Sequence, residues 1–184
     1  MSDKWRVLLI SDSTLPRHDG IATSLRALTQ ILYSLGFPAT LIGTATGREF
    51  YPHAKVISVP AITTYCGYPL AWPADRSLWQ AIRSCDIVHV HTLGPLGITG
   101  LLLAKAHRRP VMLSIHTDFD VYATHYPIIR IIARILSIIV AQRTRTGALH
   151  SIIRVAGAFA DVLVLPVPSL VADCQRLRAI SRGL

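Results

Sequence analysis

The chain has 184 residues, of which 51% are hydrophobic and 16% are charged. This composition excludes a disordered tail, a coiled coil and a collagen-like repeat. The length suits one compact α/β domain and is too short for two of ordinary size. Three cysteines without a CxxC pair favour neither a disulfide framework nor a zinc site, so a reducing, cytoplasmic compartment is expected. The sequence predicts no signal peptide and no transmembrane helix.

The net charge of +9 is unevenly distributed. Residues 127–184 carry +6, whereas residues 1–60 carry +2 and residues 61–126 carry +1. A basic segment of this kind suggests a phosphate-bearing partner or an anionic membrane. Nucleic acid is not expected, because many of the basic residues lie on an isoleucine-rich stretch without the interleaved aromatic residues of a stacking platform.

Apolar runs and helical spacings alternate along the chain. The runs predict buried parallel strands at 5–11, 38–43, 55–59, 86–90, 110–115 and 161–165. The helical spacings predict helices at 21–35, 77–84, 96–107, from Pro127 to about 156, and from Ser169 to 180. Residues 60–74 contain several Pro and Gly breakers and are expected to form a loop. This order predicts a single Rossmann-like α/β domain over residues 1–184. We expect a doubly wound sheet of about six parallel strands, with helices on both faces and 86–90 away from its edges.

The loop after the first strand is a candidate phosphate site. It reads SDSTLPRHDGIATS and lacks the glycine pattern of a dinucleotide site, and no P-loop sequence occurs in the chain. Asp19, Gly20 and Ile21 open a helix, where backbone N–H groups and the helix dipole can hold a phosphate. Gly20 would let that phosphate approach closely. An ordinary strand-to-helix turn has the same residues, so this loop alone leaves both interpretations open.

Two histidines belong to the strand at 86–90 and its end. His89 and His91 share one face of the strand because side chains alternate with a period of two. His89 is expected to be a core histidine with a hydrogen-bond partner, whereas His91 and Thr92 could face a ligand. Two histidines invite a metal interpretation, but no third ligand has a suitable spacing, so no metal site is predicted.

The loop after the strand at 110–115 is rich in polar and titratable residues. Such groups serve general acid–base chemistry or the recognition of sugar hydroxyls. They are His116, Asp118, Asp120, Tyr122, His125 and Tyr126. A solvated loop whose Asp and Thr residues cap turns is the alternative, but the concentration of these groups straight after a buried strand favours a site.

The predicted helix over residues 128–145 has a wide apolar surface. Arg130 and Arg134 fall in one narrow polar arc, and isoleucine, leucine and valine cover nearly all the rest. It is either a core helix that other elements cover on both flanks, or a helix whose apolar surface contacts lipid while its arginines reach the lipid phosphates.

Taken together, these motifs resemble the N-terminal domain of retaining GT-B glycosyltransferases of family 4. They look most similar to mannosyl-, sulfoquinovosyl- and glucosyltransferases that act on lipid acceptors. The motifs are residues 11–17 with 19–24, residues 86–92 with Gly94 and Pro95, residues 116–118 with Tyr122, His125 and Tyr126, and residues 160–162 with Pro168 and Ser169. The resemblance covers essentially the whole chain.

The resemblance implies roles for the candidate residues. Asp19, Gly20 and Ile21 would lie against the diphosphate of a nucleotide-sugar donor, such as GDP-mannose or a UDP-sugar. His116 would be the catalytic residue beside the transferred sugar. The residues facing a lipid or sugar acceptor would be Asp118, Tyr122, His125 and His91. Transfer would retain the anomeric configuration and would need no cofactor and no metal.

The resemblance also implies a second, donor-binding domain with a paired-Glu motif and a cationic diphosphate clamp. Glu49 is the only glutamate in the sequence, so no paired-Glu motif lies within it. The chain stops at Leu184, about where the linker to that domain is expected. It would then be half of a split enzyme, a truncated product or an excised domain. Without the clamp it would lack the main electrostatic contribution to catalysis, so we expect it to be inactive alone and to need a second chain.

The predicted function is therefore the acceptor-binding half of a nucleotide-sugar-dependent retaining glycosyltransferase. Arg130 and Arg134 would hold it peripherally at the inner face of the membrane. One alternative is a non-catalytic protein, derived from a glycosyltransferase half, that binds a membrane or a partner. The other is an unrelated Rossmann-like enzyme.

Overall fold

The computed structural model describes residues 4–17, 19–44, 46–65, 68–72, 76–116 and 159–165. The predicted helices from Pro127 and from Ser169 lie outside these residues. So do the candidate site residues Asp118, Tyr122, His125, Arg130 and Arg134.

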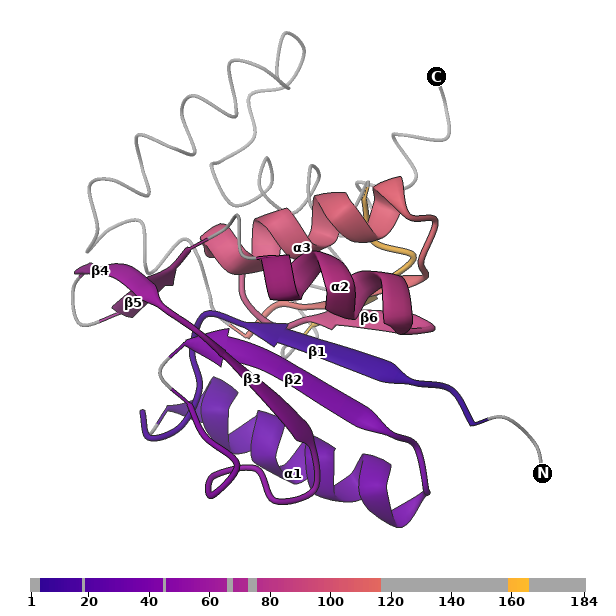
Figure 1. The fold of residues 1–184 in the computed structure, drawn as a ribbon, viewed down its shortest axis with the longest axis horizontal. Coiled ribbons are helices and arrows are strands. Elements are labelled where there is room, and N and C mark those ends of the chain that lie inside the picture. Colours follow the sequence, from indigo (N-terminus) through magenta and orange to yellow (C-terminus); the bar gives the residue numbers. More distant parts are fainter. Residues whose placement is uncertain are drawn as a thin grey trace, which may run out of the picture.

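The sheet has six parallel strands in the order β3-β2-β1-β6-β7-β8 (Figure 1). The strands are β1 (Val7–Ser11), β2 (Ala39–Thr44), β3 (Lys55–Val59), β6 (Ile87–Val90), β7 (Val111–Ser114) and β8 (Val162–Val164). β6 lies inside the sheet, between β1 and β7. The parallel sheet, its strand number and the internal position of β6 are thus confirmed.

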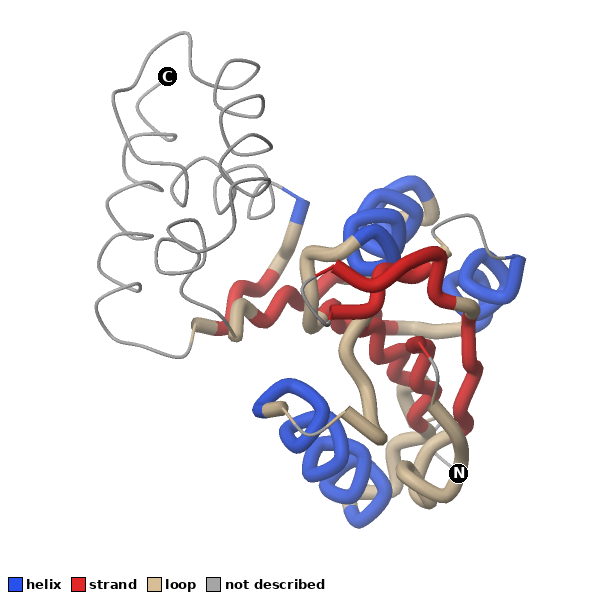
Figure 2. Tube along the Cα trace, turned by 90° about the vertical axis from the view of Figure 1, so that its left-hand side faces the viewer, coloured by secondary structure: helices blue, strands red, loops and turns tan. Residues whose placement is uncertain are grey.

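The described helices cover both faces of the sheet. They are α1 (Gly20–Ser34), α2 (Arg76–Ser84) and α3 (Pro95–Ala106). Figure 1 and Figure 2 show the strands between α1 on one side and α2 and α3 on the other. Because successive strand residues point to opposite faces, Leu9 packs in the cluster beneath α1, whereas Leu8 and Ile10 pack in the cluster beneath α2 and α3. The predicted Rossmann-like α/β class is confirmed.

Helix α1 begins and ends at residues whose chemistry specifies its ends. The Asp19 carboxylate accepts a hydrogen bond from the backbone N–H of Ala22 and caps the first turn. At the other end, Gly36 has a φ of +76°, which suits glycine because it has no Cβ. The N–H groups of Gly36 and Phe37 then donate to carbonyls of the last turn, as in a Schellman motif.

The expected loop at 60–74 is wrong in part. Residues of this segment form an antiparallel hairpin of β4 (Ala61–Tyr65) and β5 (Tyr68–Ala71). The β-branched and aromatic residues of β4 favour an extended strand. Pro69 is tolerated in β5 because the two-stranded ribbon consists of edge strands, where a missing N–H need not break a ladder.

The register brings three loops to one edge of the sheet. Ile10 of β1 pairs with Val90 of β6, and Val90 pairs with Leu113 of β7. The chain leaves these strands together at their carboxyl ends, so the loops that carry Asp12, His91 and His116 start side by side. This is the edge at which open parallel sheets bind ligands.

Candidate functional site

The Asp19 carboxylate is fully engaged within the first loop. One oxygen accepts from the Ala22 N–H at 2.8 Å. The other oxygen accepts one hydrogen bond from the Ser13 hydroxyl and another from Nε of Arg17 at 2.9 Å. The predicted phosphate-site residue Asp19 is therefore a helix cap, and any anion at this turn would meet the backbone N–H groups of Gly20 and Ile21.

The space beside Gly20 is open. A Cβ added at Gly20 would have no atom of the described residues within 4 Å. The first N–H groups of a helix have no partner inside the helix, and they point outward with the positive end of the helix dipole. The first turn of α1 thus offers backbone donors and room for an anion such as a phosphate.

Asp12 is a buried carboxylate that sequence analysis did not select. Its side chain is 0% exposed and joins the first loop to α3 and to the hairpin. The carboxylate accepts hydrogen bonds from the Thr92 hydroxyl at 2.8 Å and from the N–H groups of Leu96 at 3.1 Å, Gly97 at 3.2 Å and Ala71 at 3.4 Å. Burial raises the pKa of Asp12, and these hydrogen bonds oppose the rise by stabilising the charged form.

The hydrogen bonds to Asp12 also occupy the N-terminus of α3 and the hydroxyl of Thr92. The N-terminus of α3 is occupied by the Asp12 carboxylate and is not open to a phosphate. Thr92, which the sequence suggested as a ligand contact, is 7% exposed and donates to Asp12. Asp12 is thus a structural anion that anchors α3 next to the site.

Three histidines form a cluster at β6 and the carboxyl end of β7. Nε2 of His89 lies 2.7 Å from the Ser114 hydroxyl, which gives His89 the partner expected for a core histidine. The rings of His89 and His91 lie 3.9 Å apart. Nδ1 of His91 lies 3.1 Å from Nε2 of His116. His91 is only 3% exposed, whereas His116 is half-buried, so His116 is the more open member of this hydrogen-bonded pair.

The electrostatics keep these rings neutral at pH 7. Burial, followed by the charge that His116 can carry, lowers the pKa of His89 to about 4. Burial and then the two neighbouring histidines hold the pKa of His91 well below its ordinary value. Burial also lowers the pKa of His116, and the Asp19 carboxylate offsets part of this shift.

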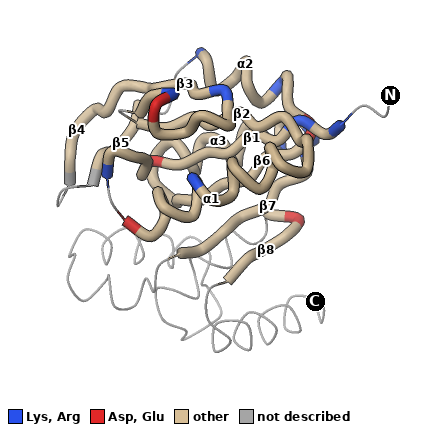
Figure 3. The backbone as a smooth tube through the Cα atoms, turned by 90° about the horizontal axis from the view of Figure 1, so that it is seen from below, with Lys and Arg blue, Asp and Glu red and all other residues tan. Residues whose placement is uncertain are grey.

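The described residues show neither a metal centre nor a membrane span. No group of three or more His, Cys, Asp or Glu residues is arranged there to hold a metal ion. None of the described helices is long and apolar enough to cross a bilayer. Figure 3 shows the described lysines and arginines spread over several elements of the fold.

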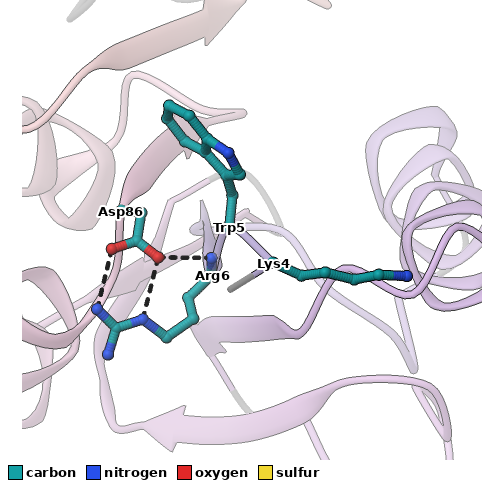
Figure 4. Close-up of a pocket in the computed structure, with 4 residues that line it drawn as sticks. All are labelled: Lys4, Trp5, Arg6 and Asp86. Atoms are coloured by element: carbon teal, nitrogen blue, oxygen red, sulfur yellow. Dashed lines mark hydrogen bonds and ion pairs between the residues drawn. The ribbon is translucent and has the colours of Figure 1, made fainter. Parts of the chain in front are cut away.

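The opposite edge of the sheet carries an open hollow of about 520 Å³. Lys4, Trp5, Arg6 and Asp86 line it (Figure 4). The Arg6 guanidinium donates to both oxygens of Asp86, at 3.0 and 2.9 Å, and the Lys4 ammonium donates to the Leu35 carbonyl at 2.9 Å. These cations are engaged with groups of the protein itself, so we assign no ligand to this hollow.

A doubly wound parallel sheet with helices on both faces is a Rossmann-like domain, a fold in which ligands bind at the carboxyl edge of the strands. The family model of Glycosyltransferase Family 4 matches residues 18–176. The chain belongs to that family. This membership agrees with the Rossmann-like half of a GT-B fold.

Two curated relatives are similar to the chain. An alpha-monoglucosyldiacylglycerol synthase of Streptococcus pneumoniae (strain ATCC BAA-255 / R6) is 29% identical over 128 residues, or 66% of this chain. An alpha-monoglucosyldiacylglycerol synthase of Acholeplasma laidlawii is 29% identical over 127 residues, also 66% of this chain. The matches cover 28% and 32% of these relatives, so this chain matches less than a third of the length of each.

Proposed function

We propose that the chain is the acceptor-binding half of a retaining glycosyltransferase that glycosylates a diacylglycerol-type lipid. The observation that carries the proposal is that two groups lie at the same edge of the sheet. Among the described residues, the first turn of α1 offers backbone donors beside an open space at Gly20, and His116 follows β7, which β6 joins to β1 at the same edge of the sheet. The family membership supports a glycosyl transfer reaction, and the names of the two relatives support the lipid acceptor.

In this proposal the N–H groups of Gly20 and Ile21 lie against the donor diphosphate, and Asp19 holds the turn that presents them. His116 lies beside the transferred sugar. Asp118, Tyr122 and His125 face the acceptor, and Arg130 and Arg134 hold the chain peripherally at the inner membrane face. The chain alone is inactive, because Glu49 is its only glutamate and a paired-Glu donor motif must come from a second domain.

The donor site is tested by placing a valine at Gly20. In an enzyme completed by a donor-binding domain, we expect Gly20→Val to lower sugar transfer about 100-fold, since the side chain would fill the space next to the diphosphate and remove its electrostatic stabilisation. We expect His116→Ala to lower transfer by a similar factor. Gly20→Val should keep the unfolding midpoint of the parent, because no atom of the described structure lies within 4 Å of a Cβ at Gly20. His116→Ala should lower the free energy of unfolding by about 1–3 kcal/mol, because it leaves Nδ1 of the buried His91 without its hydrogen-bond partner.

The matched control is Ala27→Val, which places the same side chain at an exposed position of α1 two turns away from the site. It should transfer sugar at the parent rate. Normal transfer by both Gly20→Val and His116→Ala would place the site elsewhere. Binding of the folded chain to lipid vesicles, with no transfer in the presence of any donor-binding domain, would instead favour a non-catalytic membrane-binding protein.

A further inference from the structure

The pair formed by His91 and His116 has a defined geometry. Nδ1 of His91 lies 3.1 Å from Nε2 of His116, and the two ring planes differ by 13°. Nearly parallel planes let the N–H of one ring point along the in-plane lone pair of the other. One of the two nitrogens must therefore carry the proton and donate the hydrogen bond, and the other must accept that hydrogen bond through its lone pair.

The burial of His91 decides which nitrogen donates. Both rings are neutral at pH 7, because burial lowers both pKa values, so each ring has one N–H and one bare nitrogen. Nε2 of His91 is buried and has no hydrogen-bond partner in the described structure. A proton on that nitrogen would be an orphaned buried donor, which is rare and costly. A proton on Nδ1 instead has an acceptor at 3.1 Å.

We propose that His91 is a positioning residue that donates from Nδ1 to Nε2 of His116 and so holds His116 as the Nδ1–H tautomer. The hydrogen bond made by one ring nitrogen sets the state of the other. Nδ1 of His116 then carries the proton on the side of the ring away from His91. His116 thus presents a neutral hydrogen-bond donor at the carboxyl edge of the sheet.

Among the described residues, neither of the other titratable groups around the pair, His89 and Asp19, replaces this contact. His89, on the same face of β6, uses Nε2 for the Ser114 hydroxyl at 2.7 Å and touches His91 only through its ring. Asp19, at the start of α1, uses both oxygens within its own loop. His91 is therefore the partner that the described structure gives to Nε2 of His116.

The tautomer limits what His116 can do, a consequence that rests on the proposed function. Its Nε2 is occupied by His91 and its Nδ1 already holds a proton. His116 can therefore donate a hydrogen bond to an oxygen of the bound donor, either a sugar hydroxyl or a phosphate oxygen. It cannot accept the proton that the acceptor hydroxyl loses during transfer. His116 would stabilise and orient the donor instead of acting as a general base.

Nitrogen-15 NMR of the histidine rings at pH 7.5 tests the proposal without any turnover. In the parent protein we expect His116, assigned by its loss in His116→Gln, to show a protonated Nδ1 and a bare Nε2. His91→Asn should keep this state, because an asparagine amide N–H can replace the Nδ1–H of histidine. His91→Phe keeps a ring without the donor and should shift His116 toward the Nε2–H form that free imidazole favours. His107, whose ring lies edge-on to Trp79, serves as the internal control.

A proton on Nε2 of His116 in the parent protein would overturn the proposal, and so would an unchanged Nδ1–H form in His91→Phe. If His91→Phe does not fold, the parent and His91→Asn still decide. In the completed enzyme, His91→Asn should transfer sugar several-fold faster than His91→Phe. A failure of sugar transfer with the tautomer intact would count against the proposed function and not against the hydrogen bond.

Discussion

Replacing Asp12 by alanine is expected to lower the free energy of unfolding by about 4 kcal/mol, because it leaves buried helix N–H groups and a hydroxyl without an acceptor. The side chain is 0% exposed, so water cannot readily replace the lost carboxylate. Leu96 and Gly97 donate to it from the first turn of α3, at 3.1 and 3.2 Å. The variant would therefore loosen α3 from the loop that carries the candidate site. Urea unfolding followed by circular dichroism measures the loss.

Two further variants test whether the loss of stability comes from the buried position of the Asp12 carboxylate. Asp161→Ala also removes a carboxylate that accepts a backbone N–H, that of Val111. However, the Asp161 side chain is 51% exposed, so its loss should cost only about 1 kcal/mol. Asp12→Asn should fall between the two alanine variants, since the amide keeps one acceptor oxygen. A cost for Asp12→Ala no greater than that for Asp161→Ala would show that Asp12 does not anchor α3.

Replacing Gly97 by alanine is expected to lower the free energy of unfolding by about 3 kcal/mol or more, because backbone atoms would have to move apart. A Cβ at Gly97 would overlap the backbone carbonyl oxygen of Thr92 and crowd Val90. Gly97 also donates its N–H to Asp12, so moving the helix away would lengthen that hydrogen bond as well. Glycine is needed here for close approach of helix and loop, whatever its backbone dihedral angles.

The control for Gly97 is the same substitution at Gly20. Both glycines lie in the first turn of a helix that follows a strand, but a Cβ at Gly20 meets no atom within 4 Å in the part of the chain that the structure describes. Gly20→Ala should leave stability unchanged or raise it by up to about 1 kcal/mol. Equal unfolding midpoints for Gly97→Ala and Gly20→Ala would show that α3 does not pack as closely as the structure indicates.

Most of the sheet could be predicted from the sequence because its strands are strongly patterned. The run VLLI of β1 is apolar on both faces, as a strand covered by helices on both sides must be. The predicted helix at 21–35 agrees closely with α1, because its apolar spacing is local and stops just before Gly36. The hairpin β4–β5 was missed because Pro69 and Gly67 signal a loop, and whether Pro69 is tolerated depends on its edge position.

The site was predicted only in part, because its key contacts join distant segments. Asp12 and Leu96 are 84 residues apart, and no local spacing shows that a carboxylate caps a helix so far along the chain. His91 and His116 could be placed at strand ends by pattern, but their hydrogen bond depends on the pairing of β6 with β7. An Asp directly after a buried strand, together with a later GPLG helix start, is the one signal that could have pointed to Asp12.

Whether residues 1–184 form the acceptor half of a glycosyltransferase is tested most directly by sugar transfer to diacylglycerol vesicles. The chain would be assayed with a radiolabelled nucleotide-sugar, alone and mixed with a separately produced donor-binding domain of the same family. We expect labelled glycolipid only when both parts are present, and about 100-fold less of it with Gly20→Val in the chain. Transfer by the chain alone, or equal transfer by the parent and Gly20→Val, would contradict the proposal.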